Sequence, residues 1–269
     1  MWIIMEINKQ IELLNNICPL GKGYHNSKRE HRLRFFEDIQ TEIQAYLLGF
    51  YVADGSLNEE RHTIRIKIKN TDSEILDLYS NYICPDARRV IFPETSMIGP
   101  KGKEIYISEV GQVDITGKII CDALVSYGYG SRKTYQELHL PKLSDELLWH
   151  FIRGYFDGDG CITGSISKPN KKNREVNPRL KLRAEWISKT RSLLEEINVF
   201  LSKYNIKGTI ITIKDTNTYR LSVSSIAGIK LLFNNMYKDS NFYLKRKFNK
   251  FNYYVNTEVS QLIADHRNA

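Results

Sequence analysis

The sequence lacks the features that mark membrane-spanning, secreted and zinc-binding proteins. It has no apolar run long enough to cross a bilayer, and the segment Met1–Glu6 is too short for a secretory signal. The four cysteines form no C-x-x-C pair and have no histidine at zinc-ligand spacing: Cys18, Cys84, Cys121 and Cys161. We therefore expect no membrane partner, reduced and mostly buried thiols, and an intracellular location such as an organelle matrix or a bacterial or phage cytoplasm.

Acidic residues are in the minority. The chain has 31 Asp and Glu against 39 Lys and Arg, a net charge of +8 and an isoelectric point of about 9.1. This balance allows a polyanionic partner such as nucleic acid without requiring one. With 269 residues, of which 42% are hydrophobic, the chain is long enough for one large or two modest domains with a substantial core.

Two segments of the chain read alike. Residues 45–55 are AYLLGFYVADG, and residues 150–160 are HFIRGYFDGDG. Each segment has a glycine, three large residues, a small residue and then Asp-Gly. The two acids, Asp54 and Asp159, lie 159 − 54 = 105 residues apart, about the length of one small subdomain. An internal repeat of this kind predicts two related halves.

The residues after each acid also match. Isoleucines at 64, 66 and 68 alternate with basic residues, and residues 180–184 and 219–224 alternate in the same way, so each half has strands with one buried and one wet face. The wet faces carry Arg65, Lys67, Lys69, Lys181, Arg183, Arg220 and Ser222. Further strands are expected at 89–92, 104–110 and 208–214, and helices at 7–17, 41–53, 71–83, 115–127, 190–204 and 226–236.

This pattern predicts an α+β fold with two pseudo-symmetric αββαββα halves and antiparallel sheets, packed about two central motif helices. We expect a first half at 41–130, a linker at 131–143 and a second half at 144–256. Residues 1–40 have no counterpart in the second half, and they are either an arm that contacts DNA or a solvated extension. Residues 257–269 are expected to be a tail.

Small residues recur on one side of each motif helix. Ala45, Gly49 and Ala53 repeat every four residues, as do Gly154 and Gly158. Glycine inside a helix is unfavourable by roughly 1 kcal/mol relative to alanine, so a packing reason is expected. Two smooth stripes allow two helix backbones to approach closely. We therefore predict that the two motif helices pack against each other.

The packing of these helices would bring Asp54 and Asp159 together at their C-terminal ends. Carboxylates there repel each other and the negative end of each helix dipole, and a divalent cation resolves this conflict. Oxygen ligands of this kind suit Mg²⁺, with the carbonyls of Ala53 and Gly158 as additional ligands. Such a metal, touching a phosphate, is suited to phosphodiester hydrolysis. One Asp-Gly alone predicts only a helix end and a turn, but two copies in a matching repeat favour a functional site.

The segments LLGFYVADG (47–55) and IRGYFDGDG (152–160) resemble the motif of the LAGLIDADG homing endonucleases, although Arg153 stands where a small residue is usual. The resemblance covers about residues 41–254, and two motifs in one chain resemble the monomeric branch. It implies a saddle-shaped sheet surface on double-stranded DNA, cleavage across the minor groove with 3′ overhangs, and two or three divalent ions. Mg²⁺ is the expected metal, Mn²⁺ is expected to substitute, and Ca²⁺ is expected to bind without cleavage.

The resemblance also implies a basic residue after the last helix of each half. Lys133 follows Asp54 by 79 residues, and Lys247 follows Asp159 by 88, with Lys245 as the alternative in the second cluster. A lysine there can stabilise charge on the phosphate or orient the attacking water, or it can simply be a basic helix end. The wet-face residues named above would then hold phosphates or read base edges.

Two other functions stay open on the same fold. The chain could be a maturase that binds intron RNA, or a DNA-binding regulator that does not cut. Retention of both acids favours the nuclease. The basic loop at 164–178, with Lys168, Lys171, Lys172 and Arg174, is either a solvated hairpin tip or a contact with DNA.

Overall fold

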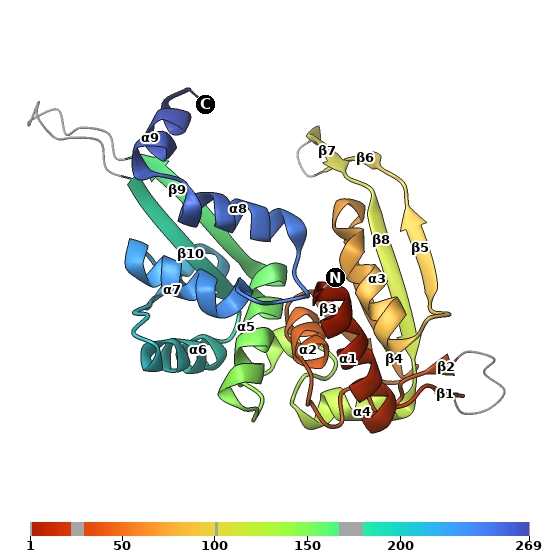
Figure 1. Cartoon of the computed structure of the whole chain (residues 1–269). Helices are drawn as coiled ribbons and strands as arrows, with labels where there is room; N and C mark the ends of the chain where they lie inside the picture. Colours follow the sequence, from red (N-terminus) through yellow and green to blue (C-terminus); the bar gives the residue numbers. More distant parts are fainter. Residues whose placement is uncertain (1, 23–29, 100–101, 167–179, 269) are drawn as a thin grey trace, which may run out of the picture. The chain divides into compact units, whose positions relative to one another are not determined.

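The computed structural model describes residues 2–22, 30–99, 102–166 and 180–268. The chain forms two compact units. Unit 1 comprises Met1–Gln136 and Pro141–Gly158, and unit 2 comprises Glu137–Leu140 and Asp159–Ala269. Among the described residues, no helix combines the length and the apolar character that a bilayer crossing needs. Each unit contains one four-stranded antiparallel sheet (Figure 1).

The sheet of unit 1 has the strand order β3–β4–β8–β5. Its strands are β3 (Gly55–Asn58), β4 (Thr63–Lys69), β5 (Arg88–Phe92) and β8 (Val110–Thr116). The isoleucines of β4 are buried and its three basic residues are exposed, as the alternating sequence predicts. Helices α3 (Ser73–Ile83) and α4 (Lys118–Ser126) pack against this sheet (Figure 1).

Unit 1 also contains α2, the first motif helix. Helix α2 spans Glu42–Asp54, and the second motif helix, α5 (Asp145–Asp159), belongs to unit 1 as far as Gly158. The remaining elements of the unit are α1 (Trp2–Ile17), β1 (Gly21–Lys22), β2 (Glu30–His31), η1 (Asn70–Asp72), β6 (Thr95–Ile98), β7 (Glu104–Ile107) and η3 (Lys133–Tyr135). Helix α2 begins with a capping box, in which the Thr41 hydroxyl accepts from the Gln44 amide and Gln44 Oε1 accepts from the Thr41 amide. Every residue from Glu42 to Val52 is buried, so α2 forms the centre of the unit.

The sheet of unit 2 has the strand order β11–β12–β10–β9. Its elements are β9 (Gly160–Ile166), β10 (Leu180–Ser188), α6 (Arg191–Lys203), β11 (Thr209–Ile213), η4 (Lys214–Thr216), β12 (Thr218–Val223), α7 (Ile226–Tyr237), α8 (Lys245–Asn256) and α9 (Val259–Asn268). In both sheets the strand that follows the motif helix is at an edge, and the next strand pairs with it. The predicted α+β class with two αββαββα halves is confirmed.

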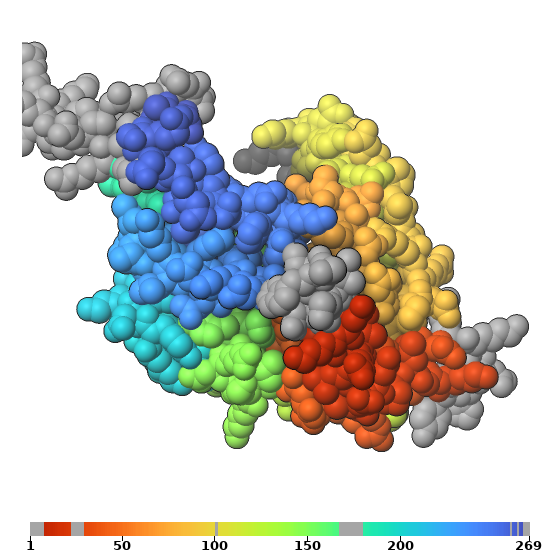
Figure 2. All heavy atoms as spheres, in the orientation of Figure 1, coloured from red at the N-terminus to blue at the C-terminus, as the bar shows by residue number. Residues whose placement is uncertain are grey.

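Several expected boundaries were wrong. The helix expected at 115–127 begins only at Lys118, because Ile115 continues the buried alternation of β8 and pairs with Ile64. The strand expected at 104–110 is divided between β7, which pairs with β6, and β8. The expected tail instead contains α9, whose Leu262 is 1% exposed. Helices α8 and α9 lie at the surface of unit 2 (Figure 2).

The N-terminal extension packs onto unit 1 where it is described. Helix α1 is longer than the expected 7–17, and Leu14, Phe35 and Phe36 are fully buried. The Arg32 guanidinium donates to Asn15 Oδ1 at 2.7 Å. A solvated tail is therefore the wrong interpretation for these parts. Three cysteines are buried and Cys161 is exposed, all as free thiols.

Candidate active site

The two motif helices pack at backbone contact inside unit 1. A β-carbon at Gly49 would lie 2.0 Å from the carbonyl oxygen of Phe151, and one at Gly154 would lie 2.0 Å from the carbonyl oxygen of Tyr46. These distances leave room only for hydrogen, so glycine is required at both positions. The predicted packing of the motif helices is therefore present, and glycine is required at its closest points.

The close contact continues to the C-terminal ends of the helices. A β-carbon at Gly158 would lie 2.2 Å from the Ala53 β-carbon and 3.1 Å from Oδ2 of Asp54. Asp54 is exposed at the end of α2, and Asp159, the residue after Gly158, is exposed at the end of α5. Each motif helix therefore ends in a carboxylate that is exposed to solvent.

A strand follows each acid directly. Gly55 is extended, with φ −78° and ψ 157°, and it begins β3, while Gly160 begins β9. Gly55 therefore does not end α2 by a left-handed turn. It is required because a β-carbon would lie 2.2 Å from the ring and 2.7 Å from the carbonyl oxygen of Tyr51. In each half the motif helix, its terminal aspartate and the first strand of the sheet thus follow one another without a loop.

A lysine contacts this junction in each half. Lys133 Nζ donates to the carbonyl oxygen of Gly55 at 2.6 Å, and Lys247 Nζ donates to that of Gly160 at 2.6 Å. Lys133 is 8% and Lys247 7% exposed, whereas Lys245 is exposed. The two predicted lysines therefore occupy equivalent positions beside the residue that follows each acid. The alternative, Lys245, lies on the first turn of α8 without burial at this junction.

Two tyrosine hydroxyls tie α2 to other parts of unit 1. The Tyr79 hydroxyl donates to the Leu47 carbonyl at 2.6 Å, and the Tyr51 hydroxyl donates to the Tyr129 carbonyl at 2.9 Å. Burial raises the pKa of both hydroxyls above the usual value for tyrosine, so both stay protonated donors. The Asp54 charge adds to the rise in the pKa of Tyr79. Lys133 Nζ lies 5.5 Å from the centroid of the Tyr51 ring.

The donors available for a metal are two carboxylates and backbone carbonyls. Within the described part of the chain, no group of three or more His, Cys, Asp or Glu side chains could hold a metal ion. Mg²⁺ commonly binds through one or two carboxylates and completes its shell with waters and substrate phosphates. An exposed aspartate at the end of each motif helix is a ligand of the type that Mg²⁺ accepts.

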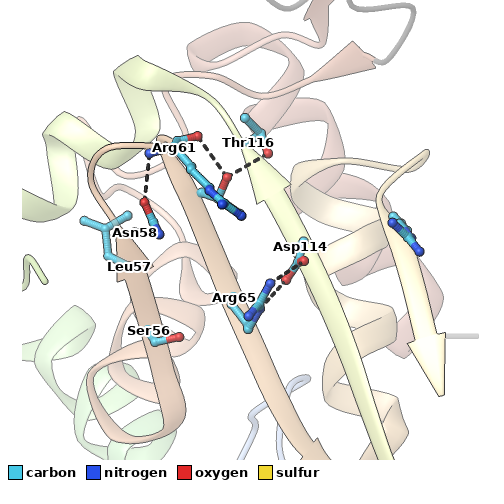
Figure 3. Close-up of a pocket in the computed structure, with 9 residues that line it drawn as sticks. Ser56, Leu57, Asn58, Arg61, Arg65, Asp114 and Thr116 are labelled. Carbon is cyan, nitrogen blue, oxygen red and sulfur yellow. Dashed lines mark hydrogen bonds and ion pairs between the residues drawn. The ribbon is translucent and has the colours of Figure 1, made fainter. Parts of the chain in front are cut away.

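The wet face of the first sheet carries a pocket of about 520 Å³ (Figure 3). Its lining is mostly polar: Ser56, Leu57, Asn58, Arg61, Thr63, Arg65, Arg88, Asp114 and Thr116. Arg65 donates to both Asp114 oxygens, at 2.8 and 2.9 Å, and Gln112 Nε2 donates to the same two oxygens at 3.0 Å. This bidentate pair holds the Arg65 guanidinium in one orientation on an exposed surface.

The other predicted wet-face residues lie where the alternation places them. Lys67 and Lys69 are exposed on β4, and Lys67 Nζ lies 4.6 Å from the centroid of the Phe92 ring. In unit 2, Lys181 and Arg183 are exposed, whereas Arg220 and Ser222 are half-buried. The basic loop residues Lys168, Lys171, Lys172 and Arg174 lie outside the described residues.

Sequence reasoning missed the acids on these faces. Glu185 accepts from Ser222 at 3.1 Å and pairs with Arg183 at 3.6 Å and Arg220 at 3.7 Å, as Asp114 pairs with Arg65. Glu185 directly follows the alternation predicted at 180–184, whereas Asp114 lies between the strand expected at 104–110 and the helix expected at 115–127 and was in no expected strand. Arg61 and Arg88 at the pocket were also missed, since one lies in a turn and the other at a strand end.

The comparisons with known proteins agree with this architecture. The sequence profile described as the LAGLIDADG-like domain matches residues 146–236. The LAGLIDADG meganuclease I-CpaMI bound to uncleaved DNA is 14% identical, with a TM-score of 0.55 over 86% of this chain and 99% of that one. The I-LtrWI LAGLIDADG homing endonuclease bound to target DNA is 13% identical, with a TM-score of 0.51 over 85% and 97%.

A more distant structural match is full-length DUF199/WhiA from Thermatoga maritima, at 16% identity and a TM-score of 0.44 over 88% of this chain and 70% of that one. None of the curated proteins compared with the chain matches it significantly. At such identities the likeness to I-CpaMI and I-LtrWI establishes the fold. Residues 146–236 therefore match the LAGLIDADG-like domain model, and the chain has the fold of the LAGLIDADG homing endonucleases of known structure.

Proposed function

We propose that the chain is a site-specific, divalent-metal-dependent endonuclease that hydrolyses both strands of double-stranded DNA across the minor groove, leaving 3′ overhangs. The observation that carries this proposal is the repeated junction of acid, glycine and lysine. In each half an exposed aspartate ends the motif helix, and a buried lysine donates to the carbonyl of the next residue. A scaffold without catalysis has no need to keep this arrangement twice.

The acids and the adjacent carbonyls are the proposed metal ligands. Asp54 and Asp159, with the carbonyls of Ala53 and Gly158, would hold two or three Mg²⁺ ions together with the scissile phosphates. The approach of Gly158 to Ala53 and Asp54 supports this, because Asp159 is covalently next to Gly158. When bound, Mg²⁺ supplies an activated water and stabilises the leaving oxygen. Mn²⁺ would substitute, and Ca²⁺ would bind without supporting cleavage.

Lys133 and Lys247 are the proposed cationic partners of the reacting phosphates. Their ammonium groups are buried and hydrogen-bonded, so they are oriented before substrate arrives. A preorganised positive charge stabilises the negative charge that develops on a phosphate, and it can orient the attacking water. Burial makes this stabilisation stronger than the same charge would give in bulk water.

Double-stranded DNA is the proposed substrate of the two wet sheet faces. Arg65, Lys67, Lys69, Lys181 and Arg183 are exposed on these faces, and the fold is shared with proteins whose structures contain bound DNA. Exposed Lys and Arg bind phosphates, whereas a guanidinium held by a carboxylate can present a fixed edge to a base. We propose that the protein acts as a monomer, because one chain carries both acids and both sheets.

The proposal is tested by incubating the full chain with Mg²⁺ and a duplex that spans the host locus without its intron. Double-strand cleavage is expected, and Asp54→Asn and Asp159→Asn should each abolish it while binding of the duplex persists. Because both substitutions keep side-chain volume, unchanged thermal unfolding is the control for folding. Binding without cleavage by the unaltered chain would favour a regulator, and binding only to intron RNA would favour a maturase.

A further inference from the structure

Polar contacts join α2 and α5 on one side of their interface. Arg153 Nη2 donates to Glu42 Oε1 at 2.7 Å, and the Tyr46 hydroxyl donates to Asp157 Oδ2 at 2.9 Å. Arg153 and Tyr46 are fully buried, Asp157 is 1% exposed and Glu42 8%. These contacts lie among side chains with little access to water, where an ionised group without a partner is strongly unfavourable.

Two further groups complete the environment of the ion pair. Gln10 Nε2 donates to Glu42 Oε2 at 3.0 Å, and an Arg153 Nη1 proton is donated to His150 Nδ1 at 2.8 Å. His150 Nδ1 lies 4.0 Å from Glu42 Oε1. The Glu42–Arg153 pair is thus held by both helices and by α1, which fixes its geometry.

The repeat places apolar residues at the mirrored positions. Because the helices are related by a shift of 105 residues, each polar residue has an apolar counterpart on the other helix: Glu42 corresponds to Leu147, Tyr46 to Phe151, Arg153 to Leu48 and Asp157 to Val52. The polar pairs Glu42–Arg153 and Tyr46–Asp157 therefore have no polar counterparts at the positions that the shift relates to them. A repeat that packed on itself symmetrically could not satisfy these residues.

Each motif helix would lose these polar contacts if it paired with a second copy of itself. Two α2 helices would place Glu42 opposite Leu48, which leaves a buried carboxylate without its cation. Two α5 helices would place Arg153 opposite Leu147 and Asp157 opposite Phe151, which leaves both charges without their α2 partners. Such unpaired buried charges discriminate against the wrong partner more strongly than added contacts favour the right one.

We propose that Glu42, Tyr46, Arg153 and Asp157 select the helix partner, so that α2 pairs with α5 and rejects α2 of a second copy, and α5 likewise rejects itself. Each motif helix is therefore covered by the other motif helix of the same chain. Arg153, which departs from the small residue of the LAGLIDADG pattern, is central to this selection. The inference concerns assembly of the chain and does not depend on DNA cleavage.

The first test is a cycle of substitutions in the full chain, read by chemical unfolding. Glu42→Leu and Arg153→Leu should each lower the unfolding midpoint, because each leaves one buried charge alone. The double variant, which carries leucine at both positions as the corresponding residues Leu147 and Leu48 do, should recover most of the loss. The unfolding equilibrium constant of the double variant should be about tenfold or more below the value expected from adding the single effects. Additive effects would overturn the proposal.

The second test asks whether the pair chooses between copies. Glu42→Arg and Arg153→Glu chains each carry like charges across the interface. When they are refolded together, exchange of helices restores an opposite-charge pair at both interfaces, so native mass spectrometry should detect a 1:1 heterodimer only in the mixture. The Glu42→Arg/Arg153→Glu chain should be a monomer with a restored midpoint. Single variants that remain monomers with the original midpoint would show that the pair does not select.

Discussion

Lys247 donates a hydrogen bond from Nζ to the carbonyl oxygen of Gly160 at 2.6 Å, a contact that Lys133 repeats with Gly55 at the same distance. The two lysines lie 87 and 78 residues from their acceptors. Lys133 lies in a single 3₁₀ turn, whereas Lys247 lies in the first turn of α8. Different local structures therefore deliver the same group to the same position, which points to a requirement of the site.

Replacing either lysine should slow cleavage more than it weakens binding. Lys133→Met and Lys247→Met each remove a preorganised positive charge, and loss of one such stabilising group typically reduces the rate about 100-fold. Single-turnover cleavage at saturating enzyme measures the rate, and a mobility-shift titration measures binding. Lys245→Met is the matched control, because Lys245 is exposed on the same helix turn. Equal effects of all three substitutions would contradict the catalytic role.

Enlarging a glycine at the helix crossing should destabilise unit 1. Gly49→Ala or Gly154→Ala places a methyl group 2.0 Å from a carbonyl oxygen of the other motif helix, so the helices must separate. We expect a loss of about 2–3 kcal/mol in the free energy of unfolding, the upper part of the range for overpacking. Urea unfolding measures it. Gly21→Ala is the control, since a β-carbon there meets nothing within 4 Å, and an unchanged midpoint for Gly154→Ala would refute the packing argument.

Releasing Arg65 from Asp114 should weaken discrimination between DNA sequences. Asp114→Asn removes a negative charge from the wet face and the bidentate acceptor that orients Arg65. The affinity for a scrambled duplex should rise, and the preference for the target over that duplex should fall. The decrease of affinity with salt concentration should become steeper by the equivalent of about one phosphate contact. Binding titrations at several salt concentrations measure both. Asp77→Asn makes the same charge change on α3, away from this face, and an identical result there would assign the effect to net charge alone.

The half-buried imidazole of His150 should make stability fall in mild acid. Burial, with the nearby Arg153 charge, lowers the pKa of His150 from 6.5 to about 4. The unfolded chain therefore binds a proton below about pH 6.5 that the folded chain accepts only near pH 4. The contribution of His150 to the free energy of unfolding should be constant above pH 6.5. As the pH falls from 6.5 to 4, this contribution should decrease by at most roughly 1.4 kcal/mol per pH unit.

The measurement compares urea unfolding of the full chain and of His150→Gln at pH 7.5 and pH 5. The variant should lose less stability than the unaltered chain over this interval, because its side chain does not titrate. Other groups contribute equally to both proteins, so the difference isolates His150. Equal losses would mean that the imidazole is not held as a neutral acceptor of Arg153.

Much of the fold was predictable from local pattern. The alternation of isoleucine with Arg65, Lys67 and Lys69 predicted β4 and its wet face, and the repeated small residues predicted the helix pair. These predictions succeed because burial and secondary structure depend on side chains a few residues apart. The boundary at 115 failed for the same reason, since the cross-strand pairing of Ile115 with Ile64 cannot be recognised from neighbours in sequence.

The sequence by itself determined that there are two halves, that each motif helix ends in an aspartate, and which strand residues face solvent, because these follow from short-range periodicity. Only the tertiary structure decided that Lys247 rather than Lys245 reaches Gly160, that Asp114 orients Arg65, and that Arg153 meets Glu42 from 111 residues away. Such contacts depend on the path of the whole chain. That path is set by the summed packing of many side chains and is not recorded in any local spacing.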